Sequence, residues 1–133
     1  MKIYIASSWK NQHGVEMLTA LLREREHEVV SFIEIETKDN HLQFDEWINS
    51  DGAQQCFVHD TDGATTSDLV IYYAPSGQDA SAEMGAAWAK GIPILGLDAK
   101  GENIGLMRFM VTQWVDNYRA LLLIIDKHSQ TNK

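Results

Sequence analysis

Short apolar segments alternate with amphipathic segments along the chain, and this alternation constrains the fold more than any other feature. Residues 2–6 (KIYIA) and 68–73 (DLVIYY) are runs of β-branched and aromatic residues that are typical of buried strands. Residues 11–26 instead carry their apolar side chains at helical spacing. Strands that alternate with helices predict one α/β domain over residues 1–133, built on a parallel sheet.

The remaining segments extend the same pattern. Further strands are expected at 28–34, at 92–97 and within 112–116, and helices at 42–49, 53–66, 79–90, 103–110 and 118–128. Gly91 is a suitable residue to end the helix over 79–90. Four to five parallel strands with helices on both faces resemble a flavodoxin-like doubly wound fold, in which ligands bind beyond the carboxyl ends of the strands.

Charge and composition exclude several classes of protein. The 133 residues include 11 Lys+Arg against 19 Asp+Glu, for a formal net charge of -8, which argues against binding to nucleic acid or to an anionic membrane. The single cysteine, Cys56, allows no intramolecular disulfide. The first residues turn polar after Ala6, and the longest apolar run, Leu121–Ile125, is too short to span a bilayer. We therefore expect a cytoplasmic protein.

Three polar segments follow predicted strands and converge on one edge of the sheet. They are SSW (7–9), APSGQDASAE (74–83) and LDAKGEN (97–103). Because the carboxyl ends of parallel strands share an edge, this convergence predicts a ligand site there.

Glu83 is an acidic residue among small ones in the segment 74–83, and it admits two interpretations. It lies in the first turn of the predicted helix, behind Asp79 and Ser81 as candidate N-caps, so it can serve the helix dipole or a capping box. It can also be a carboxylate aimed into the cleft as a nucleophile or base. The small residues that follow it allow close packing on the sheet, but spacing alone does not decide between the two roles.

The loop and the remaining polar residues give weaker signals. The segment SGQDAS (76–81) can offer backbone N–H groups to a phosphate, but it matches no P-loop or dinucleotide fingerprint, and Asp79 would repel phosphate. Trp9 is either a lid on the core or a stacking platform. The five histidines show no ligand-like spacing and Cys56 has no evident base partner, so we expect no metal site and no thiol nucleophile.

Four segments together resemble the nucleoside 2-deoxyribosyltransferase family, which includes N-deoxyribosyltransferases and deoxynucleoside 5′-monophosphate N-glycosidases. IYIASSW (3–9) is similar to the family's opening strand, and NIGLMRFM (103–110) falls at its "N-L-M"-like segment. Asp60 and Asp68 match its D-x7-D pattern. The block E-x-G-x-A-x-x-x-G-x-P is matched by Glu83, Gly85, Ala87, Gly91 and Pro93.

The resemblance implies a retaining mechanism without a metal or cofactor. Glu83 matches the nucleophile that forms a glycosyl-enzyme ester, and a helix N-terminus would favour its ionised form. Asp60 would donate a proton or orient the base, which calls for a raised pKa. Tyr4 would hydrogen-bond near the nucleophile, and Trp9 would flank the base. The substrate-binding positions implied are Ala6, Trp9, Ser76, Gly77, Asp79, Ser81, Asn103 and Met107, with Ser76 and Ser81 both open as the phosphate-reading serine.

The sequence therefore predicts an enzyme that cleaves or transfers at the N-glycosidic bond of a (deoxy)nucleoside or nucleotide through Glu83. Two alternatives stay open: a non-catalytic nucleotide-binding module on the same fold, and a glycohydrolase that cleaves NAD. The resemblance also implies a homo-oligomer (dimer or higher). Leu121–Ile125 either serves that association or packs on the sheet.

Overall fold

The central element is a sheet of five parallel strands. The computed structural model describes residues 1–35, 43–101 and 105–131. The strands are β1 (Lys2–Ala6), β2 (Glu28–Ser31), β3 (Leu69–Ala74), β4 (Ile94–Asp98) and β5 (Gln113–Val115), in the order β2-β1-β3-β4-β5. Each neighbouring pair is parallel. This is the flavodoxin-like order, so the predicted fold is confirmed.

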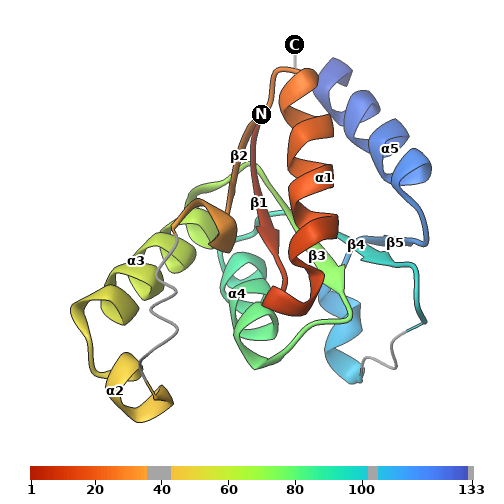
Figure 1. Cartoon of the computed structure of the whole chain (residues 1–133). Coiled ribbons are helices and arrows are strands. Elements are labelled where there is room, and N and C mark those ends of the chain that lie inside the picture. Colours follow the sequence, from red (N-terminus) through yellow and green to blue (C-terminus); the bar gives the residue numbers. More distant parts are fainter. Residues whose placement is uncertain (36–42, 102–104, 132–133) are drawn as a thin grey trace.

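Helices cover both faces of this sheet (Figure 1). Helices α1 (Gln12–Glu24) and α5 (Tyr118–Thr131) pack on one face, and α3 (Asp51–Thr66) and α4 (Gln78–Ala89) pack on the other. The short helix α2 (Phe44–Ile48) precedes α3. Three 3-10 turns complete the elements: η1 (Trp9–Asn11), η2 (Phe32–Glu34) and η3 (Leu106–Met110).

The strands are apolar throughout because each buries both of its faces. In β1, Ile3 and Ile5 face the α1–α5 layer, whereas Tyr4 and Ala6 face the α3–α4 layer. All four side chains are fully buried. Alternate residues of a strand point to opposite faces, so a central strand needs a continuous apolar run. Tyr4 is the one side chain of this run that brings a polar group into the α3–α4 layer.

Some element boundaries differ from the sequence prediction. The strand expected over 28–34 ends at Ser31, because β2 pairs only with β1 and Ser31 already lies beside Ile5, near the end of β1. Within the helix expected over 103–110, the described part forms only the short turn η3. The helix expected over 79–90 begins at Gln78, and Gly91 follows it with a φ of 76° as the pattern required.

The apolar segment Leu121–Ile125 packs on the sheet. Leu121, Leu122 and Ile125 are buried in the α1–α5 layer, which agrees with the packing interpretation of this segment. Only Leu123 is well exposed among the leucines of this run. Among the described helices, none is long and apolar enough to cross a membrane.

Candidate active site

A cavity of about 600 Å³ lies at the carboxyl ends of β1 and β3, on the α3–α4 side. It is built by the segments that follow these two strands, by the start of α4, and by residues of η2, α2 and α3. Its lining residues are Ser7, Ser8, Trp9, Phe32, Ile35, Phe44, Trp47, Cys56, Asp60, Gly77, Gln78, Asp79, Ala80 and Glu83. The segments after strands one and three converge on this cavity as predicted, whereas Asp98, from the segment after strand four, lines a different hollow.

A buried hydrogen bond joins Tyr4 to Glu83, which lines this cavity. The hydroxyl of Tyr4, on β1, donates a hydrogen bond to Oε1 of Glu83, on α4, and both residues are buried. The ring of Tyr4 lies against Gly63 of α3, where an added Cβ would stand 2.5 Å from the ring. The backbone of α3 therefore approaches β1 closely, and this close approach fixes the phenol that holds Glu83.

Glu83 does not stand where the sequence placed it in the helix. Helix α4 begins at Gln78, so Glu83 is its sixth residue and lies in the second turn. The N-cap is Gly77, without a side-chain cap, and Asp79 and Ser81 are helical residues. The expected first-turn position of Glu83 and the two candidate caps are wrong, because the helix starts earlier than Asp79. Capping thus does not account for the burial of this carboxyl group.

Burial controls the protonation of Glu83. Desolvation raises the pKa of Glu83, the Tyr4 hydrogen bond lowers it, and the charges of Asp60 and Asp79 raise it, which together bring it to about 8. Burial therefore opposes the ionised form of Glu83 that a helix N-terminus would favour. Burial and the neighbouring carboxylates raise the pKa of Tyr4 far above its ordinary value, so its hydroxyl remains a donor.

Asp60 reaches the same cavity from α3. Burial raises the pKa of Asp60 to about 6, against a lowering by His59, while Asp79 raises it further. Its Oδ1 atom is buried without a hydrogen-bond partner, as is the hydroxyl of Ser8. Buried polar atoms are normally paired, so two unpaired ones in one cavity wall indicate room for a polar ligand.

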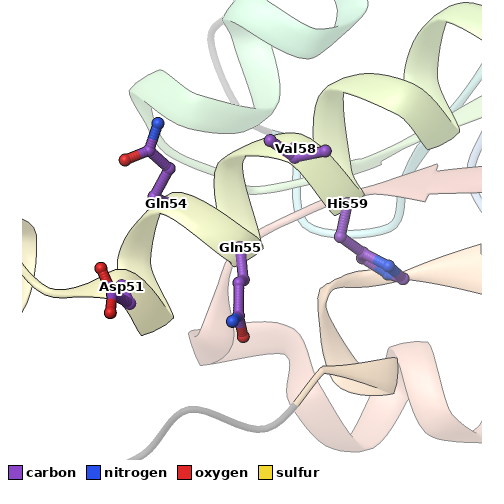
Figure 2. A pocket seen from close by; sticks show the side chains of 5 residues that line it. All are labelled: Asp51, Gln54, Gln55, Val58 and His59. Atoms are coloured by element: carbon purple, nitrogen blue, oxygen red, sulfur yellow. The ribbon is translucent and has the colours of Figure 1, made fainter.

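His59 precedes Asp60 on α3 but belongs to another surface. Figure 2 shows its ring directed toward the segment of β2, where its Nε2 lies 3.0 Å from the carbonyl oxygen of Ser31. Together with Asp51, Gln54, Gln55 and Val58 it lines a separate hollow along α3 (Figure 2). None of these five residues lines the Glu83 cavity.

The structure places the predicted substrate-binding residues in three different surroundings. Trp9, Gly77 and Asp79 line the cavity. Ala6 is buried at the end of β1 behind it. Ser76 donates a 2.7 Å hydrogen bond to the hydroxyl of Tyr72, and the Ser81 hydroxyl lies 3.4 Å from the same group.

Two predicted residues are not brought to the cavity. Met107, on η3, lines a different apolar hollow beside Trp88 of α4. Asn103 lies outside the described residues.

Several lining residues escaped the sequence analysis. Trp9 packs edge-on against Phe32 with 4.6 Å between ring centroids, and Phe44 and Trp47 of α2 extend this aromatic wall. Phe44 is 68% exposed, so it covers little of the core. No sequence signal placed α2 beside this cavity, because the position of such a short helix depends on tertiary packing. Among the described residues, no cluster of His, Cys, Asp and Glu is arranged to hold a metal ion.

Comparison with solved structures places this fold among known enzymes. A 2-deoxyribosyltransferase from Bacillus psychrosaccharolyticus shares 22% sequence identity, with 91% of this chain and 90% of that chain covered and a TM-score of 0.74. A CMP N-glycosidase from Clostridium botulinum shares 22% identity over 95% and 99% of the two chains, with a TM-score of 0.64. A conserved protein from Enterococcus faecalis shares 17% identity over 96% and 98%, with a TM-score of 0.71.

The sequence itself has no such match. No family model matches it, and neither does any curated protein. At these identities the structural likeness establishes the fold, and it agrees with the resemblance that the sequence motifs indicated.

Proposed function

We propose that the chain is a single catalytic domain of the nucleoside 2-deoxyribosyltransferase family that cleaves or transfers at the N-glycosidic bond of a nucleoside. The observation that carries this proposal is the buried Tyr4–Glu83 hydrogen bond on a cavity wall that Asp60 shares. A carboxyl group that packing does not require, held by a phenol and facing a cavity, is suited to attack an electrophilic carbon. Two of the structural neighbours carry out deoxyribosyl transfer and N-glycoside cleavage, as their names state.

The proposed reaction proceeds in two displacements at the anomeric carbon. A carboxylate oxygen of Glu83 forms a bond to C1′ while the C1′–N bond breaks and its electron pair goes to the base. Asp60 gives its proton to the departing base. Water, or a second free base, then attacks C1′, its proton goes to Asp60, and the ester bond to Glu83 breaks with the electron pair returning to the carboxylate. Hydrolysis and transfer differ only in which acceptor reaches the ester.

The protonation of the two carboxyl groups fits this reaction when they are treated as a pair. Burial gives Glu83 a pKa of about 8 and Asp60 a pKa of about 6, so the pair holds one proton near pH 7. The reactive form has that proton on Asp60, whereas the resting form has it on Glu83. Both forms carry the same charge, so they gain and lose protons over the same pH range. The rate is expected to be bell-shaped in pH, with limbs near these two pKa values.

The lining of the cavity favours a nucleoside without a 5′-phosphate. Three acidic residues, Asp60, Asp79 and Glu83, line it, and none of its described lining residues is Lys, Arg or His. A phosphate would meet these carboxylates without a compensating cation. We therefore place the neutral nucleoside before the nucleoside 5′-monophosphate as substrate, and before NAD with its diphosphate.

Base exchange tests this function directly. The protein is incubated with a panel of 2′-deoxynucleosides and ribonucleosides, their 5′-monophosphates and NAD, with and without a second free base, and the products are separated by chromatography. Glu83→Gln is expected to abolish turnover, and Glu46→Gln, at an exposed position of α2, is the matched control. Mass spectrometry of the quenched wild type is expected to show the sugar added to the peptide that contains Glu83. Wild type that binds nucleosides without turnover would support the non-catalytic alternative instead.

Self-association is proposed on a separate surface. Trp88 of α4 and Leu106, Met107 and Phe109 of η3 are exposed and share one apolar hollow. An exposed apolar cluster of this kind is suited to contact a second copy of the chain, as the family resemblance implies. Light scattering of wild type and of Phe109→Ser is the test, and a concentration-independent monomer in the wild type would contradict this assignment.

A further inference from the structure

Asn11 is a buried polar residue for which the reaction itself has no use. It ends the turn η1 just after Trp9, and its side chain is 8% exposed. Its amide Nδ2 donates to the Ser7 hydroxyl at 3.0 Å and to the carbonyl oxygen of Pro75, and the carbonyl oxygen of Tyr73 lies at 3.4 Å. A buried amide that donates to acceptors on two separate segments joins those segments to each other.

The segments that Asn11 connects are two rims of the cavity. The segment 7–9 follows β1 and brings Trp9 to the cavity, and the segment 75–77 follows β3 and brings Gly77. The pairing of β1 with β3 ends at Ala6 and Tyr72, and the pairing of β3 with β4 ends at Ala74 and Asp98, so the segments 7–9 and 75–77 both lie beyond the paired strands. Ser7 adds one further bond between the rims, from its hydroxyl to the carbonyl oxygen of Tyr73 at 2.9 Å.

The reacting carboxyl group is fixed by a different set of contacts. Glu83 lies in the second turn of α4 and is held by Tyr4 in the interior of β1, and neither group contacts Asn11 through a described hydrogen bond. A change at Asn11 would therefore move the rims that enclose the nucleoside and leave the Tyr4–Glu83 pair in place.

We propose that Asn11 is a positioning residue that sets the separation of the two rims and thereby the affinity of the cavity for its nucleoside. The proposal rests on the function proposed above, because it assigns the rims to nucleoside binding. Asn11 does not line the cavity, so it acts only through Ser7 and through the backbone before Gly77. Its effect belongs to the binding of substrate rather than to the chemical step.

The test replaces Asn11 with aspartate, which has the same shape but cannot donate when ionised. In Asn11→Asp the carboxylate would face the carbonyl oxygens of Tyr73 and Pro75, so the rims are expected to separate. We expect KM to rise about tenfold, kcat to stay within about twofold, and both limbs of the pH profile to stay in place. Asn11→Ser, which is smaller and keeps one donor, replaces it if the aspartate variant does not fold.

Tyr118→Phe is the matched control for lost stability. Tyr118 also lies in a hydrogen-bond network, a partly buried one, donating to the carbonyl oxygen of Gly14 at 2.6 Å, with the hydroxyl of Tyr73 at 2.7 Å, but on the α1–α5 side of the sheet. It is expected to lower the melting temperature without changing KM. Two results would overturn the proposal. One is an Asn11 variant with a lower melting temperature and an unchanged KM, as expected for Tyr118→Phe, and the other is a loss of kcat at constant KM.

Amide hydrogen exchange keeps this proposal separate from the proposed function. Exchange in Asn11→Asp is expected to be faster at residues 7–9 and 76–78 and unchanged over β1 and the second half of α4. If wild type turns over no nucleoside, the enzymatic function fails, and nucleoside dissociation constants together with exchange rates then decide the role of Asn11. Equal amide exchange rates in the two rims, together with equal nucleoside dissociation constants in wild type and variant, would refute the positioning role of Asn11.

Discussion

The hydroxyl of Tyr4 donates to the carboxyl group of Glu83, joining the interior of β1 to the second turn of α4 across 79 residues of sequence. Both ends of this hydrogen bond belong to regular elements of the core. The candidate nucleophile is therefore positioned by the sheet and its covering helix, and the surrounding loops contribute the rims of the cavity. A reactive group on rigid elements keeps its geometry when the loops adjust to a ligand.

Removing the Tyr4 hydroxyl should weaken catalysis and move one limb of the pH profile. The Tyr4 hydrogen bond lowers the pKa of Glu83, so Tyr4→Phe raises that pKa above about 8. The proton of the pair then stays on Glu83 more strongly. We expect kcat/KM near pH 7 to fall about tenfold and the alkaline limb to move to higher pH. Tyr73→Phe, on the next strand and the opposite face, is the control, and an unmoved limb in Tyr4→Phe would contradict the prediction.

In Asp60→Asn, the bell-shaped dependence of the rate on pH should become a single rise to a plateau. The variant cannot give a proton to the departing base, so we expect kcat to fall about 100-fold for neutral bases. The charge of Asp60 also raises the pKa of Glu83, so removing it lets Glu83 ionise at lower pH. The rate should therefore rise through one ionisation below pH 8 and then level off. Asp62→Asn, exposed on the same helix, should retain the wild-type profile.

The sequence predicted the sheet because the strands bury both faces, which leaves a strong apolar signal in a short segment. Residues 68–73 and 92–97 were placed to within two residues of β3 and β4 for this reason. The start of α4 was misplaced because Gly77 caps it without a side chain, and no N-cap residue marks the boundary. Local sequence signals do not mark such a cap. The first-turn position predicted for Glu83 was therefore wrong as well.

The spacing of the sequence motifs predicted the two carboxylates and the tyrosine of the candidate site, because these residues stand on regular elements. Asp60 and Glu83 line one cavity and Tyr4 donates to Glu83, although the three come from different elements. The aromatic wall with Phe44 and Trp47 was not predictable, because it depends on where a short helix lies relative to the sheet. The buried role of Asn11 was equally hidden, since its acceptors are backbone atoms of a distant loop.

A methyl group at Gly63 should disturb the site from outside the cavity. An added Cβ would stand 2.5 and 2.8 Å from two ring atoms of Tyr4 and 3.2 Å from a methyl group of Val30. Gly63→Ala should therefore lower the free energy of unfolding by about 1–3 kcal/mol through overpacking, and it should weaken the bond from Tyr4 to Glu83. Urea denaturation measures the first effect, and a fall in kcat/KM measures the second.

Gly85→Ala is the control for this change and has the opposite expected sign. Nothing lies within 4 Å of a Cβ built at Gly85 in α4, so the close packing on the sheet expected for this residue is not needed. An alanine there improves helix propensity and should raise stability by up to about 1 kcal/mol. Equal effects of the two alanines on stability would contradict the steric argument.

Protonation of Glu83 should also be visible as a pH dependence of stability. Burial raises the pKa of Glu83 from 4.5 to about 8, so the folded state holds this proton more tightly than the unfolded state does. The contribution of this proton to the free energy of unfolding is therefore complete below pH 4.5, and that contribution is lost as the pH rises toward 8. Asp60, with a pKa of about 6, contributes in the same direction only up to that pH.

The window between pH 6 and pH 8 isolates Glu83 from Asp60. There the free energy of unfolding of the wild type should fall by roughly 1.4 kcal/mol per pH unit more than that of Glu83→Gln, which has no proton to lose at this position. Urea denaturation at pH 6, 7 and 8 measures both slopes, with Glu46→Gln as the exposed control. Parallel slopes for wild type and Glu83→Gln would mean that Glu83 is already ionised at pH 6, and the shared proton of the pair would have to be abandoned.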